Sequence, residues 1–281
     1  MRMNFDGILI MSDMDGTFLG KKSSIVPKNI EAIKYFINNG GRFTFATGRP
    51  SFEFNRLVPM VRDIVNAPVA TANGSCMYDF RDECAVDNVY LDVEPTLEML
   101  NYVKVNHPEI NARFFSNTNI LSEEISGRLA VIWPTLNNKD YYKICGPIAN
   151  WECKKWIKGI FTSIYDDMDD FRLDIIERYG DTFEFNRSSK RLLEFQRIGC
   201  NKASRVEWLR EYYKLQGVGI TIVAAGDYEN DLGMLKAANI AVCPANAIGT
   251  VKEISDYCLC NPNEGLIADI IEKIEQGIIK V

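Results

Sequence analysis

Short apolar runs alternate with helical segments at both ends of this 281-residue chain. The runs that predict strands cover residues 7–12, 42–46, 68–72, 220–225, 240–243 and 257–260. The intervening helices are predicted at about 28–38, after Lys202, and at about 230–238. Strands that alternate with helices in this way favour a parallel sheet with helices on both faces, so the fold class is predicted to be α/β.

The middle of the chain, from about residue 84 to 195, is richer in aromatic and charged residues. Its pattern predicts helices at Pro95–Val105 and Trp151–Tyr165. Predicted strands follow the short apolar segments 113–115, 141–145, 182–185 and 192–195. We therefore expect residues 84–195 to form a second domain inserted into a discontinuous first domain of residues 1–83 and 196–281.

The first predicted strand ends in two acids, Asp13 and Asp15, followed by Gly16 and Thr17. Side chains two positions apart in an extended segment point the same way, which places the two carboxylates roughly 6 to 7 Å apart on one side. Two hard oxygen ligands with no nearby histidine or cysteine favour Mg²⁺, the ion suited to phosphate chemistry. The alternative is a strand that ends in an ordinary Asp-Gly turn.

Three further segments carry polar groups where a strand ends or a helix begins. Thr47 and Gly48 follow the second strand and offer the hydroxyl and backbone N–H donors that a phosphoryl group needs. The segment Gly226–Asp231 follows another strand, and Lys202 opens a helix. Ligands of open parallel sheets bind at the carboxyl ends of the strands, so these pieces are expected to form one site. Taken alone, Thr47-Gly48 is also compatible with the exit of a strand into a turn, Gly226–Asp231 with a helix N-cap, and Lys202 with a surface lysine.

Together these residues resemble the haloacid-dehalogenase-like superfamily of phosphohydrolases, and within it the Cof-type branch. The motifs of that superfamily are matched, in order, by Asp13-x-Asp15-Gly16-Thr17, Thr47-Gly48-Arg49, Lys202 and Gly226-Asp227-x-x-Asn230-Asp231. Two shorter branch features are matched by Ala72-Asn73-Gly74 and Asn246-Ala247. The chain departs from the branch at Ala203, where glycine is frequent, but no expected catalytic group is missing.

The resemblance implies a Rossmann-like parallel sheet core with an inserted α+β cap, and hydrolysis of phosphate monoesters of small metabolites such as sugar phosphates. It implies Asp13 as the nucleophile that becomes an aspartyl-phosphate, and Asp15 as the general acid and base. The expected cofactor is Mg²⁺, held by the Asp13 carboxylate, the Asp15 carbonyl and Asp227. Asp231 would act through water or as a support for the other ligands.

The remaining site residues divide between the phosphoryl group and the rest of the substrate. The residues expected to hold the phosphoryl oxygens are Met14 through its amide, Thr47, Gly48, Lys202 and Asn230. The residues expected to contact substrate are Arg49, Asn73, Lys143 and Arg187. The cap is expected to close over the leaving group and to select the substrate.

The composition of the chain limits the kinds of partner and the cellular location that we expect. A net charge of −6 argues against nucleic acid, which demands clustered Lys and Arg, whereas a small phosphorylated metabolite remains compatible. No stretch is long and apolar enough for a membrane span, and the N-terminal segment is not a signal peptide. Eight cysteines without a C-x-x-C pair predict reduced, mostly buried thiols in a cytoplasmic enzyme, either a monomer or a weak homo-oligomer.

Two other functions stay open at this point. A phosphosugar mutase uses similar motifs but returns the phosphoryl group to a sugar rather than to water. A non-catalytic, receiver-like module would use Asp13 as a phospho-acceptor, although such a module needs neither Asp15 nor an inserted domain.

Overall fold

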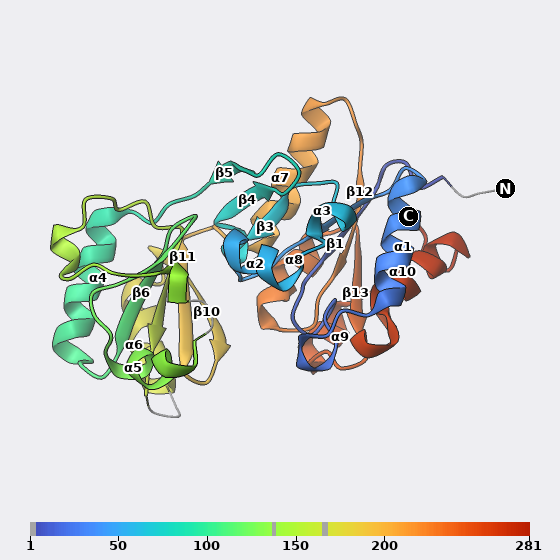
Figure 1. Cartoon of the computed structure of the whole chain (residues 1–281). Helices are drawn as coiled ribbons and strands as arrows, with labels where there is room; N and C mark the ends of the chain where they lie inside the picture. Colours follow the sequence, from blue (N-terminus) through green and yellow to red (C-terminus); the bar gives the residue numbers. More distant parts are fainter. Residues whose placement is uncertain (1–3, 137–138, 165–167) are drawn as a thin grey trace. The chain divides into compact units, whose positions relative to one another are not determined.

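The computed structural model describes residues 4–136, 139–164 and 168–281, which divide into two compact units (Figure 1). The first unit contains the chain up to Arg49, Glu53–Asp87 and Asn201–Val281. The second contains Pro50–Phe52 and Asn88–Cys200. The role of residues 84–195 as a substrate-specificity cap stays a prediction.

A five-stranded sheet forms the centre of the first unit, in the order β14-β13-β12-β1-β2, and every neighbouring pair is parallel. Its strands are β1 (Ile8–Ser12), β2 (Arg42–Phe45), β12 (Thr221–Ala225), β13 (Ile240–Pro244) and β14 (Tyr257–Leu259). All five residues of β1 are buried, as expected of a parallel strand covered on both faces. The predicted α/β class and parallel sheet are confirmed.

Alternate residues of β1 belong to different hydrophobic cores, one on each face of the sheet. Ile8 and Ile10 pack with α1 (Pro27–Asn38) and α10 (Leu266–Glu275). Leu9 and Met11 pack with α7 (Lys202–Leu215) and α8 (Leu232–Ala237). Figure 1 shows α1 and α10 side by side, which agrees with their contacts. This layering leaves the carboxyl ends of the strands as the edge where polar residues can gather.

Helix α7 begins at a capping box that sets the position of its first residue. The Asn201 side chain accepts a hydrogen bond from the Ser204 N–H at 3.0 Å, and the Ser204 hydroxyl in turn accepts from the Asn201 N–H at 3.3 Å. These bonds satisfy donors that a helix N-terminus otherwise leaves free. Lys202 therefore occupies the first position of a fixed helix start rather than a flexible loop.

Shorter elements complete the first unit. A small sheet has the order β3-β4-β5, formed by β3 (Val69–Thr71), β4 (Cys76–Asp79) and β5 (Cys84–Asn88). The short α-helices are α3 (Val61–Ile64), α9 (Gly249–Ile254) and α2 (Ser51–Leu57), of which the part from Glu53 onward belongs to this unit. The 3₁₀ turns are η1 (Lys21–Ser23), η2 (Ala72–Gly74), η6 (Glu229–Asp231) and η7 (Pro262–Glu264).

The second unit is built on a six-stranded sheet in the order β10-β11-β9-β6-β7-β8. Its strands are β6 (Asn111–Phe115), β7 (Ile120–Ser122), β8 (Tyr142–Ile144), β9 (Lys158–Thr162), β10 (Phe183–Ser189) and β11 (Leu192–Arg197). Neighbouring strands are antiparallel except β7 and β8, which are parallel. Its helices are α4 (Val93–Asn106), α5 (Gly127–Ile132) and α6 (Asp169–Tyr179), with 3₁₀ turns η3 (Trp133–Thr135), η4 (Lys139–Tyr141) and η5 (Ile148–Asn150). The predicted α+β character of this region is confirmed.

The predicted helix at Trp151–Tyr165 is wrong, because residues Lys158–Thr162 form the central strand β9; Tyr165 lies outside the described residues. All five residues of β9 are buried although Lys158 and Thr162 are polar, so its sequence shows neither a continuous apolar run nor the alternation that marks a strand. Gly159 lies directly against the Phe195 ring, where an added Cβ would collide with it. The glycine therefore serves close packing inside a sheet, which a helix would not need.

The exposed surface contains more thiols than expected. All eight cysteines are free, but Cys84, Cys145, Cys153 and Cys258 are exposed, so the prediction of mostly buried thiols is wrong. Cys84 and Cys258 belong to the edge strands β5 and β14, which are covered less completely than central strands.

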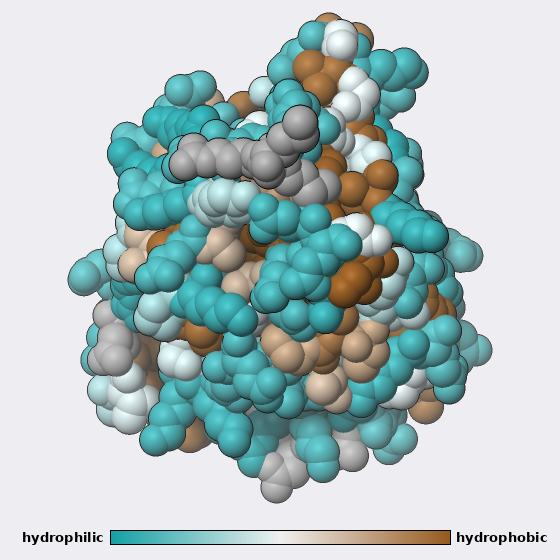
Figure 2. All heavy atoms as spheres, turned by 90° about the vertical axis from the view of Figure 1, so that its right-hand side faces the viewer, coloured by the Kyte–Doolittle hydropathy of each residue, from teal (hydrophilic) through white to brown (hydrophobic). Residues whose placement is uncertain are grey.

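Hydrophilic residues predominate on the face shown in Figure 2, and apolar residues there form separate patches. Within residues 4–136, 139–164 and 168–281, no helix combines the length and apolar character that a membrane crossing requires.

Replacing Gly159 by alanine tests the packing of β9. The added methyl must displace the Phe195 ring in a close-packed core, so we expect a loss of about 1–3 kcal/mol in the free energy of unfolding, measured by denaturant titration. Gly219→Ala is the matched control, since nothing lies within 4 Å of its added Cβ. Equal stability of the two variants would contradict the strand packing described here.

Candidate active site

Three adjacent strands deliver polar residues to one edge of the parallel sheet. Asp13 follows β1, Thr47 lies two residues beyond β2, and Asp227 lies two residues beyond β12. The Asp13 N–H donates to the Ala225 carbonyl of β12 at 2.8 Å, so the β1–β12 ladder continues up to the site. Since β2 and β12 flank β1 on opposite sides, this edge is a topological switch point, where open α/β sheets bind ligands.

The Lys202 ammonium joins two of the acids. Its Nζ lies 2.5 Å from Oδ1 of Asp13 and 2.7 Å from Oδ1 of Asp231. All three side chains are buried, with residue exposures of 1% for Lys202, 7% for Asp13 and 0% for Asp231. A lysine this deeply buried stays charged only with anionic partners, so the contact ties α7 to β1 and to η6.

Asp231 is fully engaged by the protein. Its Oδ1 binds Lys202, while Oδ2 accepts the N–H groups of Asp227 at 2.9 Å and Tyr228 at 3.2 Å. The carboxylate thereby fixes the turn between β12 and η6 and sets the position of Asp227. The Asp227 carboxylate itself accepts a hydrogen bond from the Thr17 hydroxyl at 2.7 Å.

Gly16 permits the close approach of the two acidic loops. Its φ of +93° is a left-handed conformation that side-chain-bearing residues rarely adopt. An added Cβ would also overlap the Asp227 carboxylate. The turn after Asp15 therefore requires glycine both for its backbone conformation and for the space that Asp227 occupies.

Burial raises the pKa of both Asp13 and Asp227. The pKa of Asp13 lies well above its usual range because of burial and the Asp231 charge, opposed by Lys202. The pKa of Asp227 rises from 3.8 to about 6, mainly through burial. Burial alone would lower the pKa of Lys202, but Asp13 and Asp231 together raise it. The cluster therefore favours a bound cation in addition to the lysine.

The acidic cluster fits a divalent cation. One carboxylate oxygen from each of Asp13, Asp227 and Asp231 lies within 4.8 Å of the others. Three carboxylates against the single ammonium of Lys202 leave two negative charges uncompensated when all are ionised. Oxygen-only ligands with this residual charge match the preference of Mg²⁺.

Asp15 lies apart from the buried acids. Its carboxylate forms a two-point ion pair with Arg49, in which Nε and Nη2 each donate at 2.9 Å. Hydrogen bonding to Asp15 raises the pKa of the Arg49 guanidinium. Arg49, an expected substrate contact, thus binds Asp15, the expected general acid, in this structure, and the roles of both stay predictions.

A tight turn supports the Thr47–Arg49 loop. The Asn73 N–H donates to the Thr47 carbonyl and the Ala72 N–H to the Arg49 carbonyl, both at 2.9 Å. Gly74 has a positive φ that glycine adopts readily, but Ala72 and Asn73 also have positive φ, a costly conformation that persists only where the surroundings impose it. Arg205 of α7 donates to the Gly74 carbonyl and lies 2.5 Å from Asp87. The loop is therefore linked through η2 to the helix that carries Lys202.

The other expected residues divide between the two units. Met14 directly follows Asp13 with its side chain in the core, and half-buried Asn230 lies in η6 between Glu229 and Asp231. Lys143 is exposed on β8 of the second unit. Arg187, on β10 of the same unit, pairs with Asp169 at 2.6 Å. The roles of these four residues stay predictions.

Two supporting residues were not assigned a role from the sequence. Thr17 lies inside the Asp-x-Asp-Gly-Thr motif, which was the available signal for its contact with Asp227. Arg205 lies three residues after Lys202, a spacing that brings side chains to one face of a helix. Its burial at 4% exposure was not evident from the sequence.

Comparison with known proteins identifies the family. Residues 10–271 match the profile of the haloacid dehalogenase-like hydrolases. The chain belongs to this family. The resemblance suggested by its four motifs is thereby confirmed.

Among relatives of this haloacid dehalogenase-like hydrolase is the 5-amino-6-(5-phospho-D-ribitylamino)uracil phosphatase YcsE of Bacillus subtilis. It is 29% identical over 258 residues, which is 91% of each protein. The pyridoxal phosphate phosphatase YbhA of Escherichia coli is 22% identical over 272 residues, covering 94% of this chain and 97% of that protein. The family and these relatives show that the chain is a phosphatase.

A solved haloacid dehalogenase-like hydrolase from Bacteroides thetaiotaomicron has the same fold. The two structures give a TM-score of 0.79 over 95% of this chain and 98% of that one, at 23% sequence identity. At this identity the likeness establishes the architecture alone, including the parallel core sheet and the second, mostly antiparallel sheet.

The raised pKa values predict how stability of this phosphatase depends on pH. Asp227 titrates near pH 6 when folded, so the folded protein binds more protons than the unfolded chain above about pH 4. Metal-free protein should therefore lose stability as the pH rises from 4 to about 6. Added Mg²⁺, which binds ionised carboxylates, should raise the melting temperature more at pH 7.5 than at pH 5, measured by scanning calorimetry.

Asp227→Asn provides the control, because the amide neither titrates nor attracts the cation as strongly. We expect this variant to show a flatter pH profile and a smaller response to Mg²⁺. A melting-temperature increase that is the same at pH 5 and pH 7.5 would contradict the assignment of this cluster as the metal site.

Proposed function

We propose that this protein is a Mg²⁺-dependent phosphatase that hydrolyses phosphate monoesters of small metabolites through an aspartyl-phosphate on Asp13. The observation that carries the proposal is the buried cluster at the end of β1. There Lys202 and the three aspartates surround a single point at a topological switch of the sheet. Phosphoryl transfer depends mainly on such positioning and charge neutralisation.

Asp13 is the proposed nucleophile. Lys202 holds its Oδ1, which leaves Oδ2 to form the bond to phosphorus while the bond to the leaving oxygen breaks. The anhydride formed on Asp13 is then cleaved by water, which releases inorganic phosphate and restores the carboxylate. A buried carboxylate held by one hydrogen bond has lost most of the hydration that would weaken it as a nucleophile.

Bound Mg²⁺ would supply positive charge that offsets the repulsion between the carboxylates and the phosphoryl oxygens. The Asp13 carboxylate, the Asp15 carbonyl and Asp227 are the residues that would hold it. Asp231 would support them, since both its oxygens already accept hydrogen bonds from the protein.

The phosphoryl oxygens are proposed to bind Lys202, the Thr47 hydroxyl and the amides of Gly48 and Met14, with Asn230 as a further donor. The Thr47 hydroxyl accepts the Arg49 N–H at 3.2 Å, an orientation that keeps its own proton available to another oxygen. Burial of Thr47 at 1% exposure limits competition from water.

Asp15 is proposed to protonate the leaving oxygen and later to take a proton from the attacking water. The ion pair with Arg49 engages both oxygens of the Asp15 carboxylate. The first step requires the protonated form. We therefore propose that Arg49 leaves Asp15 for the substrate phosphate when a phosphate ester binds.

The proposed substrates are sugar phosphates or related phosphorylated cofactors. The names of the two relatives, a phosphoribitylamino-uracil phosphatase and a pyridoxal phosphate phosphatase, support small phosphorylated metabolites of this kind. Asn73, Lys143 and Arg187 are proposed substrate contacts, with the second unit supplying selectivity as a cap. A cytoplasmic monomer or weak homo-oligomer remains our proposal for location and assembly.

Phosphate release from a panel of phosphate esters tests the function. We expect turnover with Mg²⁺ and none after chelation, and Asp13→Asn should lower kcat by about 10⁴-fold or more because an amide does not attack phosphorus. Asp6→Asn, an exposed acid at the start of the same segment, should keep full activity. Formation of an isomeric sugar phosphate instead of free phosphate would show a mutase.

The Asp15→Asn variant tests the proton transfer. We expect its kcat to fall by roughly 10²- to 10⁴-fold with alkyl phosphates, the usual share of a general acid. With nitrophenyl phosphate, whose leaving group needs no proton, the loss in formation of the aspartyl-phosphate should be much smaller, measured as the burst of nitrophenol. Equal losses for both substrates would argue against the acid role.

A further inference from the structure

The guanidinium of Arg205 joins three parts of the first unit. Arg205 lies on α7, and the residue is 4% exposed. Its Nε donates to the Gly74 carbonyl of η2, and its Nη1 lies 2.5 Å from Oδ2 of Asp87 on β5. Because an unpaired buried charge is costly, these contacts hold α7, η2 and the end of β5 together.

The turn η2 packs directly against the first turns of α7. A Cβ added to Gly74 would lie 2.6 Å from the Asn201 carbonyl oxygen and 3.1 Å from Cγ of Arg205. The two residues before Gly74 have φ of 51° and 55°, values that side-chain-bearing residues keep only where the surroundings impose them. The contact with Arg205 is one such constraint on η2.

The turn η2 in turn holds the Thr47–Arg49 loop. The N–H groups of Ala72 and Asn73 donate to carbonyl oxygens of that loop, both at 2.9 Å. Lys202 lies three residues before Arg205, a spacing that brings side chains to one face of a helix. Arg205 therefore connects the Thr47–Arg49 loop, through η2, to the helix turn that carries Lys202.

The same contacts lie where the chain leaves or re-enters the first unit, which it does next to Arg49, Asp87 and Asn201. Asp87 pairs with Arg205 itself. The turn η2 binds the Arg49 carbonyl, and Asn201 caps the helix that carries Arg205. Arg205 and η2 therefore connect these three crossing points to one another within the first unit.

We propose that Arg205 is a positioning residue of the phosphatase reaction, which holds the Thr47–Arg49 loop in place relative to Lys202. This role rests on the proposed function, in which the loop and Lys202 bind the phosphoryl oxygens. The guanidinium is engaged by Gly74 and Asp87, so Arg205 acts through the backbone of η2.

Steady-state kinetics of Arg205→Met, with Mg²⁺ and a phosphate ester, test the proposal. Methionine fills similar space but donates to neither partner. We expect kcat to fall about ten- to a hundredfold, since a displacement of about 1 Å in the groups that position a substrate has an effect of this size. Arg210→Met is the matched control, because Arg210 lies on the same helix and also donates to a carboxylate, Glu207, and to a backbone carbonyl, Ala237. It should keep the wild-type kcat, and equal losses in the two variants would overturn the proposal.

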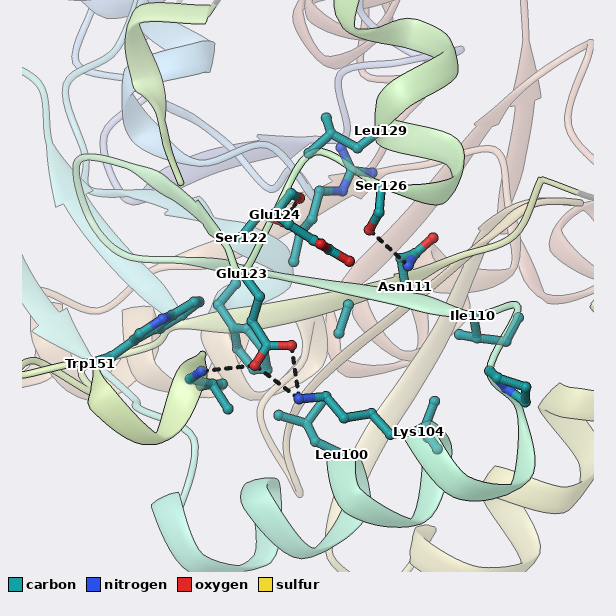
Figure 3. Close-up of a pocket in the computed structure, with 16 residues that line it drawn as sticks. Leu100, Lys104, Ile110, Asn111, Ser122, Glu123, Glu124, Ser126, Leu129 and Trp151 are labelled. Atoms are coloured by element: carbon teal, nitrogen blue, oxygen red, sulfur yellow. Dashed lines mark hydrogen bonds and ion pairs between the residues drawn. The ribbon is translucent and has the colours of Figure 1, made fainter. Parts of the chain in front are cut away.

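Lys104→Met is a control in the second unit. Lys104 lines a cavity of about 280 Å³ there, and its ammonium pairs with Glu123 at 2.8 Å (Figure 3). Removing this ion pair leaves the contacts of η2 intact, so kcat should equal that of the wild type. A loss as large as that of Arg205→Met would show that any broken ion pair suffices, which would overturn the proposal.

A double-mutant cycle separates positioning from a general loss of stability. Thr47→Val removes the hydroxyl that is proposed to bind a phosphoryl oxygen. Its cost in kcat should be smaller in Arg205→Met than in the wild type, because a displaced hydroxyl contributes less. Thr17→Val, which removes a hydrogen bond to Asp227, should cost the same in both backgrounds. Equal costs of Thr47→Val in the two backgrounds would overturn the proposal.

Hydrogen exchange tests the inference without relying on turnover. The amides of Ala72 and Asn73 should exchange about tenfold faster or more in Arg205→Met, the change expected when one buried hydrogen bond is lost, and at the wild-type rate in Arg210→Met. Unchanged exchange in Arg205→Met would overturn the positioning role. A wild-type protein without turnover would refute the proposed function, and the exchange rates would still decide whether Arg205 holds η2.

Asp87→Asn covers the case in which Arg205→Met does not fold. The Asp87 side chain is 34% exposed, so its replacement loosens the guanidinium with little effect on core packing. We expect kcat to fall about two- to tenfold, with faster exchange of the same two amides and folding checked by circular dichroism. If Arg205→Met is unfolded, wild-type kcat and exchange rates in folded Asp87→Asn would overturn the proposal.

Discussion

The candidate active site of this protein depends on the buried ammonium of Lys202. This ammonium joins Asp13 and Asp231, which belong to segments separated from it by 189 and 29 residues. Because a buried lysine without anions is strongly disfavoured, the contact requires β1, η6 and α7 to meet at one place. The capping box at Asn201 supports this arrangement by fixing where α7 begins. The same lysine partly compensates a cluster that remains negative and so favours a cation.

The three aspartates of the cluster, of which Asp13 and Asp231 are buried and Asp227 is half-buried, make different contacts although they share one site. Asp231 has both oxygens occupied by Lys202 and backbone donors, so it fixes a turn. Asp13 has one oxygen bound to Lys202, which suits a nucleophile held in position. Among the residues that the structure describes, Thr17 is the one side-chain donor to Asp227, whose pKa lies near 6, so a cation stabilises its ionised form most directly. The three aspartates are the same residue type and therefore differ only through the contacts that the protein makes with each of them.

Local patterns predicted the parallel core well and the second unit less well. The strands of the first unit are continuous apolar runs that end in turn residues, and the helices between them bury a single face. The same reasoning wrongly predicted a helix at β9. This strand is central and covered on both faces, so its sequence lacks the alternation of apolar and polar residues that marks a strand. Gly159 was the available hint, but its meaning depends on the Phe195 ring, which reaches it only after two strands have paired.

The sequence by itself determined the fold class and most of the site, because each motif follows a strand and parallel strands bring their carboxyl ends to one edge. Tertiary structure alone decided the pairing of Arg49 with Asp15 and the contact of Arg205 with η2. Periodicity in the sequence determines which face of a helix or strand a residue occupies. It does not determine which residue from another segment contacts it there. Burial and charge compensation depend on segments that are distant in sequence, and only packing brings those segments together.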